Sequence, residues 1–240
     1  MDKSVPWLRI AVEGAVIVVS ILLAFGIDAW WQSAELKREV AQELQSVGRE
    51  LRRNQNLLEF QIDMSERIVR GSDAVLALMD AGGRAPSVSV PDTLAFLVHT
   101  WLTFDPSLGA LDALVASGRL AAIPDPETRL RLSGLRAFIE DAGDLQLPTR
   151  GLYYDQMLPI ISQEAAYDHY AVSDVSDRFW AAERLPGRAL ESATSVDYPN
   201  TQRLRVLIRE RRGLFNTTVA EMTQLLAEFK ALASMIGVDE

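Results

Sequence analysis

One uncharged apolar run near the N-terminus, residues 14–27, constrains this chain more than any other feature. Alone it is shorter than the roughly 20 residues that a helix needs to cross a bilayer. Trp7 before the run and Trp30–Trp31 after it lie where interfacial tryptophans belong, and Arg9 can extend its charge to the headgroups. The sequence therefore predicts one transmembrane helix from roughly Leu8 to Trp31.

A cleaved signal peptide is the alternative interpretation of the same run. Ala24-Phe25-Gly26 would serve as a cleavage site. Glu13 inside the apolar segment and the double tryptophan after it are unusual for a signal peptide. We therefore favour a retained anchor, with residues 1–32 as cytoplasmic tip and membrane span and residues 33–240 as the extramembrane domain.

The polar and small residues of the span follow helical spacing. On a helix of 100° per residue they fall within an arc of about 100°. Carboxylates at membrane depth usually face protein or water, and small residues permit close helix approach. This face predicts an interface with another membrane helix, although Arg9 and Glu13 could instead pair with each other near the headgroups. The face consists of Arg9, Glu13, Ser20, Ala24 and Asp28.

Two stretches resemble an uncharacterised family of bacterial single-pass inner-membrane proteins that carry a domain of unknown function. Residues 13–54, EGAVIVVSILLAFGIDAWWQSAELKREVAQELQSVGRELRRN, resemble the family's apolar span, its Asp/Asn-x-Trp end and its long charged helix. Residues 111–135, LDALVASGRLAAIPDPETRLRLSGL, are similar to the family's middle region. Here Glu13-Gly14 replaces the family's Gly-Glu. The resemblance implies a membrane topology and a helical domain, and it implies no activity.

The charges that flank the span do not decide its orientation. Two Lys or Arg side chains lie near it on each side, so the positive-inside rule favours neither orientation. A very short N-terminal segment without acidic excess generally stays in the cytoplasm, and the resemblance points the same way. We expect a cytoplasmic N-terminus and a C-terminal domain in a bacterial periplasm.

The extramembrane part predicts an all-α fold in which the span continues into a stalk helix, Ser33 to Asp80. Residues 81–86 end this helix, and a last amphipathic helix runs from about Thr201 to Ile236. Two long helices at the two ends of a domain most simply pack as an antiparallel bundle. The apolar stripe expected on the stalk is Leu36, Val40, Leu44, Val47, Leu51, Leu58, Ile62, Val69, Leu76 and Met79.

Shorter helices should close this bundle. They are expected over residues 91–102, from Asp105 to Gly118, and from Asp125 to about Asp141. A further helix to Tyr170 should be disturbed at Pro159. Residues 171–199 predict loops around a short helix, and no strand is expected.

Composition excludes several classes of function. A net charge of −9 argues against a nucleic-acid partner. The chain has no cysteine, and its two histidines, His99 and His169, have no metal-ligand spacing. We find no catalytic, metal-binding or cofactor-binding motif, so we do not expect an enzyme. A tyrosine-rich segment, residues 153–170, could line a ligand pocket, although its helical spacing is typical of a core.

A local cluster of arginines lies near the start of the last helix. Its candidate docking patch is Arg203, Arg205, Arg209 and Arg212, to which Arg211 adds a further charge. The alternative is a solvated face that pairs with acidic stalk residues such as Glu59, Asp63 and Glu66.

These features together predict a membrane-anchored interaction or scaffold protein, for example an accessory subunit of a larger inner-membrane complex. Its partners would be the lipid bilayer and either another membrane protein or further copies of itself. The alternatives are a helical ligand-sensing ectodomain and a periplasmic enzyme without a recognisable motif.

Overall fold

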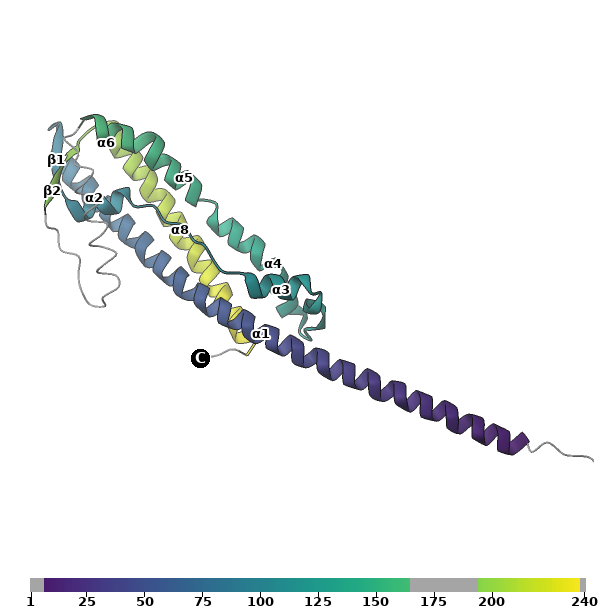
Figure 1. Ribbon diagram of the computed structural model, residues 1–240. Coiled ribbons are helices and arrows are strands. Elements are labelled where there is room, and N and C mark those ends of the chain that lie inside the picture. Colours follow the sequence, from purple (N-terminus) through teal and green to yellow (C-terminus); the bar gives the residue numbers. More distant parts are fainter. Residues whose placement is uncertain (1–6, 165–193, 238–240) are drawn as a thin grey trace, which may run out of the picture.

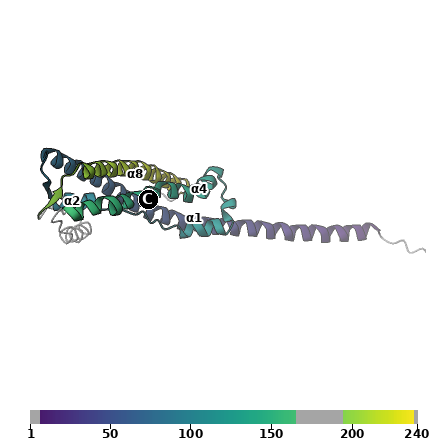
Figure 2. The same cartoon turned by 90° about the horizontal axis from the view of Figure 1, so that it is seen from above.

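The computed structural model describes residues 7–164 and 194–237, and most of them are helical. The first helix, α1, runs without a break from Trp7 to Ala81. Its 75 residues make a rod of about 110 Å at 1.5 Å per residue. Figures 1 and 2 show the other elements gathered along the C-terminal part of this rod, while its N-terminal part projects alone. The predicted continuation of the apolar segment into a stalk is confirmed.

The last helix, α8 (Gln202–Met235), packs antiparallel along α1. Arg205, near the start of α8, pairs with Asp80 at the end of α1. Lys230, near the end of α8, lies 2.9 Å from the carboxylate of Glu59. The predicted antiparallel pairing of the two terminal helices is therefore confirmed.

The two long helices meet along seams in which the buried residues alternate at spacings of three and four. This spacing is typical of coiled-coil packing. On α1 the buried seam consists of Val47, Leu51, Asn54, Leu58, Gln61, Ser65, Ile68, Ser72, Val75 and Met79. On α8 it consists of Leu204, Ile208, Arg211, Phe215, Thr218, Met222, Leu225, Phe229 and Leu232.

The predicted apolar stripe on the stalk is partly wrong. Leu36 is 40% exposed, and Leu44, Ile62 and Val69 are only half-buried. Polar residues hold four of the seam positions on α1 instead. A prediction that uses apolar residues alone omits these four positions, so the predicted stripe departs from the observed seam.

The short helices at the end of the bundle nearer to the projecting part of α1 are α3 (Gly109–Ala116), a 3₁₀ turn η1 (Arg119–Ala122) and α4 (Pro126–Gly143). The N-cap predicted for α4 is present, because Asp125 accepts a hydrogen bond of 2.7 Å from the backbone N–H of Thr128. The helix expected to start at Asp105 begins four residues later, at Gly109. Its first N–H groups bond to Glu50 of α1, with 2.8 Å to Ala110.

Two short strands correct the expectation of a strand-free chain. β1 (Ser87–Pro91) and β2 (Ser195–Pro199) pair antiparallel, with Val88 opposite Tyr198. Each has only five residues, too few for an alternating pattern to stand out in the sequence. They close the end of the bundle that lies farther from the projecting part of α1, beside α2 (Asp92–His99).

The disturbance expected at Pro159 is present as a π-helical turn just before it. α5 (Gln146–Gly151) continues into this turn, η2 (Leu152–Met157), and then into α6 (Leu158–Glu164). Proline cannot donate to the carbonyl four residues earlier, which loosens the helix at that point. Residues 165–193, including the helix expected around Phe179-Trp180, lie outside the described part of the chain.

The buried apolar side chains form two main clusters along the bundle. The proximal cluster, nearer to the projecting part of α1, includes Val47, Leu132 and Phe229, and Ile236 packs against it. The distal cluster includes Val75, Tyr153 and Tyr198. The fold therefore holds one end of α8 against the lower stalk and the other against the strand pair.

Candidate functional site

The projecting part of α1 is apolar and has no protein cover in the structure. Every residue from Val12 to Ser33 is exposed, and the helix is long and apolar enough to cross a membrane. A signal sequence would pass the same test of length and composition. The five residues predicted for the intramembrane face all lie in this one helix, as do the three tryptophans that flank its apolar segment, Trp7, Trp30 and Trp31.

Two polar residues of that face bond within the helix itself. Ser20 Oγ donates to the carbonyl of Val16 at 2.8 Å, and Gln32 Nε2 donates to Asp28 Oδ2 at 2.8 Å. Such local bonds lower the cost of placing these groups near lipid. They leave the helix able to lie against lipid or against another helix.

The arginines of the candidate docking patch divide into two kinds. Arg203 and Arg209 are exposed on the outer face of α8. The side chain of Arg205 is only 13% exposed. It pairs with Asp80 and donates hydrogen bonds to Asn200 and to the carbonyl groups of Met79 and Gly83. Arg212 forms an ion pair of 2.6 Å with Asp73. Two of the four arginines therefore pair with acidic residues of the stalk, as the alternative interpretation expects. The partners are Asp80 and Asp73, and the expected Glu59 pairs with Lys230.

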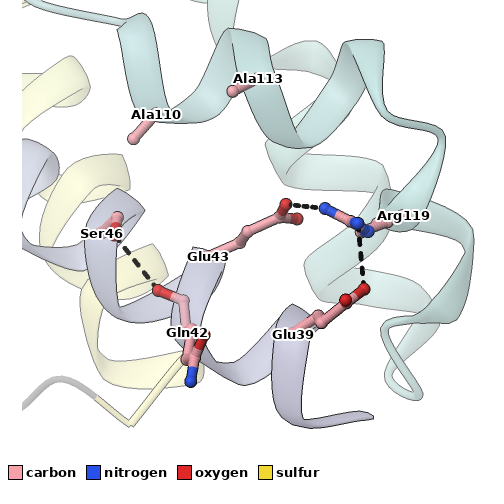
Figure 3. A pocket seen from close by; sticks show the side chains of 7 residues that line it. All are labelled: Glu39, Gln42, Glu43, Ser46, Ala110, Ala113 and Arg119. Atoms are coloured by element: carbon pink, nitrogen blue, oxygen red, sulfur yellow. Dashed lines mark hydrogen bonds and ion pairs between the residues drawn. The ribbon is translucent and has the colours of Figure 1, made fainter. Parts of the chain in front are cut away.

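A groove opens between the lower stalk and the α3–η1 segment (Figure 3). It has a volume of about 420 Å³. Arg119 spans it, with ion pairs to Glu43 and, at 3.0 Å, to Glu39. The Glu43 carboxylate raises the pKa of Arg119 above its ordinary value. The second carboxylate oxygen of Glu43 is buried and has no hydrogen bond among the described residues. Short side chains, Ala110 and Ala113, leave the space open.

A fully buried arginine, Arg211, lies beside the distal core, over the ring of its member Tyr153. Arg211 has 0% exposure, and its Nη2 group donates to the carbonyl of Thr100. Its guanidinium carbon lies 4.9 Å from the centre of the Phe215 ring and 6.0 Å from that of Tyr153. Burial lowers the pKa of Arg211 to about 10, so the side chain stays charged at neutral pH.

Aromatic rings connect this arginine to the surface. The His99 ring lies 5.4 Å from Tyr153, and its Nε2 atom lies 3.1 Å from the Tyr198 hydroxyl. Tyr153 contacts Tyr154 edge to face at 5.0 Å, and Tyr154 accepts a hydrogen bond of 3.1 Å from the Trp101 indole. Burial raises the pKa of Tyr153 to about 12, which keeps its hydroxyl protonated. We call these five rings together with Arg211 the arginine–aromatic cluster.

The sequence indicated part of this cluster. Tyr153 and Tyr154 belong to the tyrosine-rich segment, whose later members Tyr167, His169 and Tyr170 lie outside the described residues. Arg211 was visible as one arginine of the patch, and its seam position separates it from the others, since it lies three or four residues from buried Ile208 and Phe215. Tyr198 carried no signal of its own, because β2 reaches the cluster only through the tertiary fold.

The side chains gathered at these places supply charge, hydrogen bonds and aromatic contacts. Among residues 7–164 and 194–237, no group of three or more His, Asp or Glu side chains could hold a metal ion. No protein-family model, no curated protein and no solved structure matches the chain.

Proposed function

We propose that this chain is a membrane-anchored interaction protein, for example an accessory subunit of a larger inner-membrane complex. One observation carries the proposal. The apolar, uncovered segment and the buried seam of the domain belong to one unbroken helix, α1. A rigid connection of this kind fixes the height and rotation of the domain relative to whatever holds the span.

The partner contact is proposed to lie in the membrane. The face of Arg9, Glu13, Ser20, Ala24 and Asp28 combines charge with small side chains, which suits close packing of helices in lipid. The partner is another membrane protein or a second copy of this chain. We propose a bacterial inner membrane as its location, with a cytoplasmic N-terminus and a periplasmic domain, because the family that residues 13–54 and 111–135 resemble has this topology.

The groove at Glu39, Glu43 and Arg119 supplies a second contact for the same partner. It lies about 12–18 Å beyond Trp31 along the helix, at 1.5 Å per residue. Its unfilled carboxylate oxygen on Glu43 suits a basic side chain. A partner held at the span would present its own juxtamembrane residues at this height.

Extraction and assembly experiments test the proposal. The full-length chain should remain in membranes after carbonate washing, whereas a soluble form starting near Ile27 would establish cleavage and remove the anchor. In mild detergent it should migrate as a stoichiometric complex, detected by affinity purification and mass measurement.

Two substitutions locate the contact in the span. Glu13→Leu should weaken assembly, since an interhelical hydrogen bond in membranes contributes about 1–2 kcal/mol. Val18→Leu lies on the opposite face of the helix and is the matched control. Assembly that is equally strong in both variants, or a clean monomer of the natural chain, would contradict the proposal.

A further inference from the structure

Arg211 differs from the other arginines of the described structure because it is fully buried, and no acidic side chain of the described residues pairs with it. Its neighbours on the same helix, Arg205 and Arg212, each pair with an aspartate of α1. Arg211 makes one hydrogen bond, to a neutral carbonyl oxygen, and its Nε and Nη1 groups make none within the described residues. A guanidinium offers five N–H donors, so most of its bonding capacity is unfilled.

A buried charge left in this state is costly. Removing an ion from water costs several kcal/mol even after relaxation, and a counter-charge normally offsets that cost. The flanking rings of Phe215 and Tyr153 supply cation–π attraction, which replaces only part of the lost hydration. Leucine or methionine at the same seam position would pack without this cost. The position therefore indicates a charge that is kept for an anion.

The surroundings of Arg211 also suit an anion. Tyr153 brings a protonated hydroxyl to the same cluster, and a hydroxyl can donate to an oxyanion beside the guanidinium. The π-helical turn that carries Tyr153 is a feature often found at binding sites, since it widens the helix locally.

A second arginine marks the outer end of the aromatic chain. The guanidinium carbon of Arg150 lies 4.9 Å above the Trp101 ring and 5.7 Å from the Tyr154 ring. Both Arg150 and Tyr154 are exposed. A positive charge at the surface and another at the buried end would draw an anion inward along the rings.

We infer that the arginine–aromatic cluster is a binding site for a small monocarboxylate anion, held by Arg211 and the hydroxyl of Tyr153. A planar carboxylate matches the guanidinium fork in geometry and in charge, one negative for one positive. A phosphate dianion would need a second cation beside Arg211, whereas Arg150 lies over the Trp101 and Tyr154 rings. The apolar part of the ligand would contact the rings of Phe215 and Tyr153. This inference is independent of the partner proposed for the span.

The full-length chain in detergent micelles provides the test, with acetate as the probe. Acetate replaces chloride at constant sodium concentration and neutral pH, while calorimetry follows thermal unfolding. A ligand that binds only the folded state raises the melting temperature with the logarithm of its concentration. The natural chain should show such a rise, and Arg211→Met should not. Arg209→Met, an exposed arginine half a turn away, is the matched control and should respond as the natural chain does.

Direct binding gives a second measurement that does not depend on a variant. In saturation-transfer nuclear magnetic resonance, the protein should transfer magnetisation to the acetate methyl group, and formate should compete with it. An equal calorimetric response in Arg211→Met would mean that acetate acts through bulk salt effects and would overturn the inference. So would a natural chain that shows neither transfer nor a shift in melting temperature.

Discussion

The side chain of Asn54 on α1 holds the backbone of Ser107 through both of its polar groups. Its Nδ2 atom donates to the Ser107 carbonyl at 2.7 Å, and its Oδ1 atom accepts from the Ser107 N–H at 3.1 Å. One turn earlier on the same helix, Glu50 accepts from the N–H groups of Ala110 and Leu111. Asn54 is fully buried in the seam. Two polar side chains of the stalk therefore fix where the chain turns into α3.

Replacement of Asn54 by alanine should destabilise the domain by about 1–3 kcal/mol, the cost of leaving buried polar groups without partners. Urea unfolding followed by circular dichroism measures the change. Asn56→Ala is the matched control, because Asn56 is exposed two residues away on the same helix. Equal effects of the two substitutions would show that the hydrogen bonds between Asn54 and Ser107 contribute nothing to the free energy of unfolding.

The hydrogen bonds of Asn54 and Glu50 also show which helix ends can be predicted from the sequence and which cannot. The ends of α1, α4 and α8 were predictable because their signals are local: Gly83 at φ 56°, Asp125 before Pro126, and Thr201 as an N-cap. The start of α3 was predicted too early, because its first N–H groups are satisfied by Glu50, sixty residues away in the chain.

The candidate sites also differ in how far the sequence predicts them. The apolar segment and its polar face can be predicted from composition and helical spacing, because all of their residues lie in one helix, α1. The arginine–aromatic cluster draws on α2, η2, β2 and α8, so no single segment carries its pattern. Arg211 differs from its arginine neighbours only by its position in the seam, and that position becomes visible once the register of α1 against α8 is known.

Glu221 on α8 should be a destabilising residue at neutral pH. Burial and the nearby Asp141 and Asp144 raise the pKa of its carboxyl above the ordinary value of 4.5. One of its oxygens is buried and has no hydrogen bond among the described residues. Glu221→Gln should therefore raise the melting temperature at pH 7, because it removes a charge that is less favourable in the folded state than in the unfolded state.

The gain from Glu221→Gln should depend on pH with a defined sign. A carboxyl whose folded pKa is raised contributes stability that is fully present below pH 4.5 and is lost as the pH rises through the folded pKa. The difference between variant and natural chain should thus be small at pH 4 and larger at pH 7 in calorimetry. Glu210→Gln, on the exposed face of the same helix, should show no such trend. A stabilisation that is the same at both pH values would contradict the cause assigned here.

Arg205 should matter for the stability of the distal end of the bundle. It joins α8 to the end of α1 through Asp80 and two carbonyl groups, and it also bonds to Asn200, which follows β2. Arg205→Met should cost about 1.5–3 kcal/mol, the range for hydrogen bonds to a charged group. The same substitution should also speed up hydrogen exchange of the backbone amides in β1 and β2. Arg203→Met, an exposed neighbour, serves as control, and identical exchange in both variants would mean that Arg205 is free to act as a docking residue.

Phe229 should be among the most sensitive positions in the chain, because it lies fully buried in the proximal cluster between α8, the stalk and α4. Phe229→Ala removes the ring and leaves a cavity, for which the cost is about 3–5 kcal/mol. A domain with 5–15 kcal/mol of stability would lose a large part of it. The variant should therefore unfold at markedly lower urea concentration, while Val206→Ala, at a position that is 49% exposed on the same helix, should change little. If Phe229→Ala unfolds at the same urea concentration as the natural chain, the end of α8 does not pack on the lower stalk, and the domain is held together mainly by its distal core.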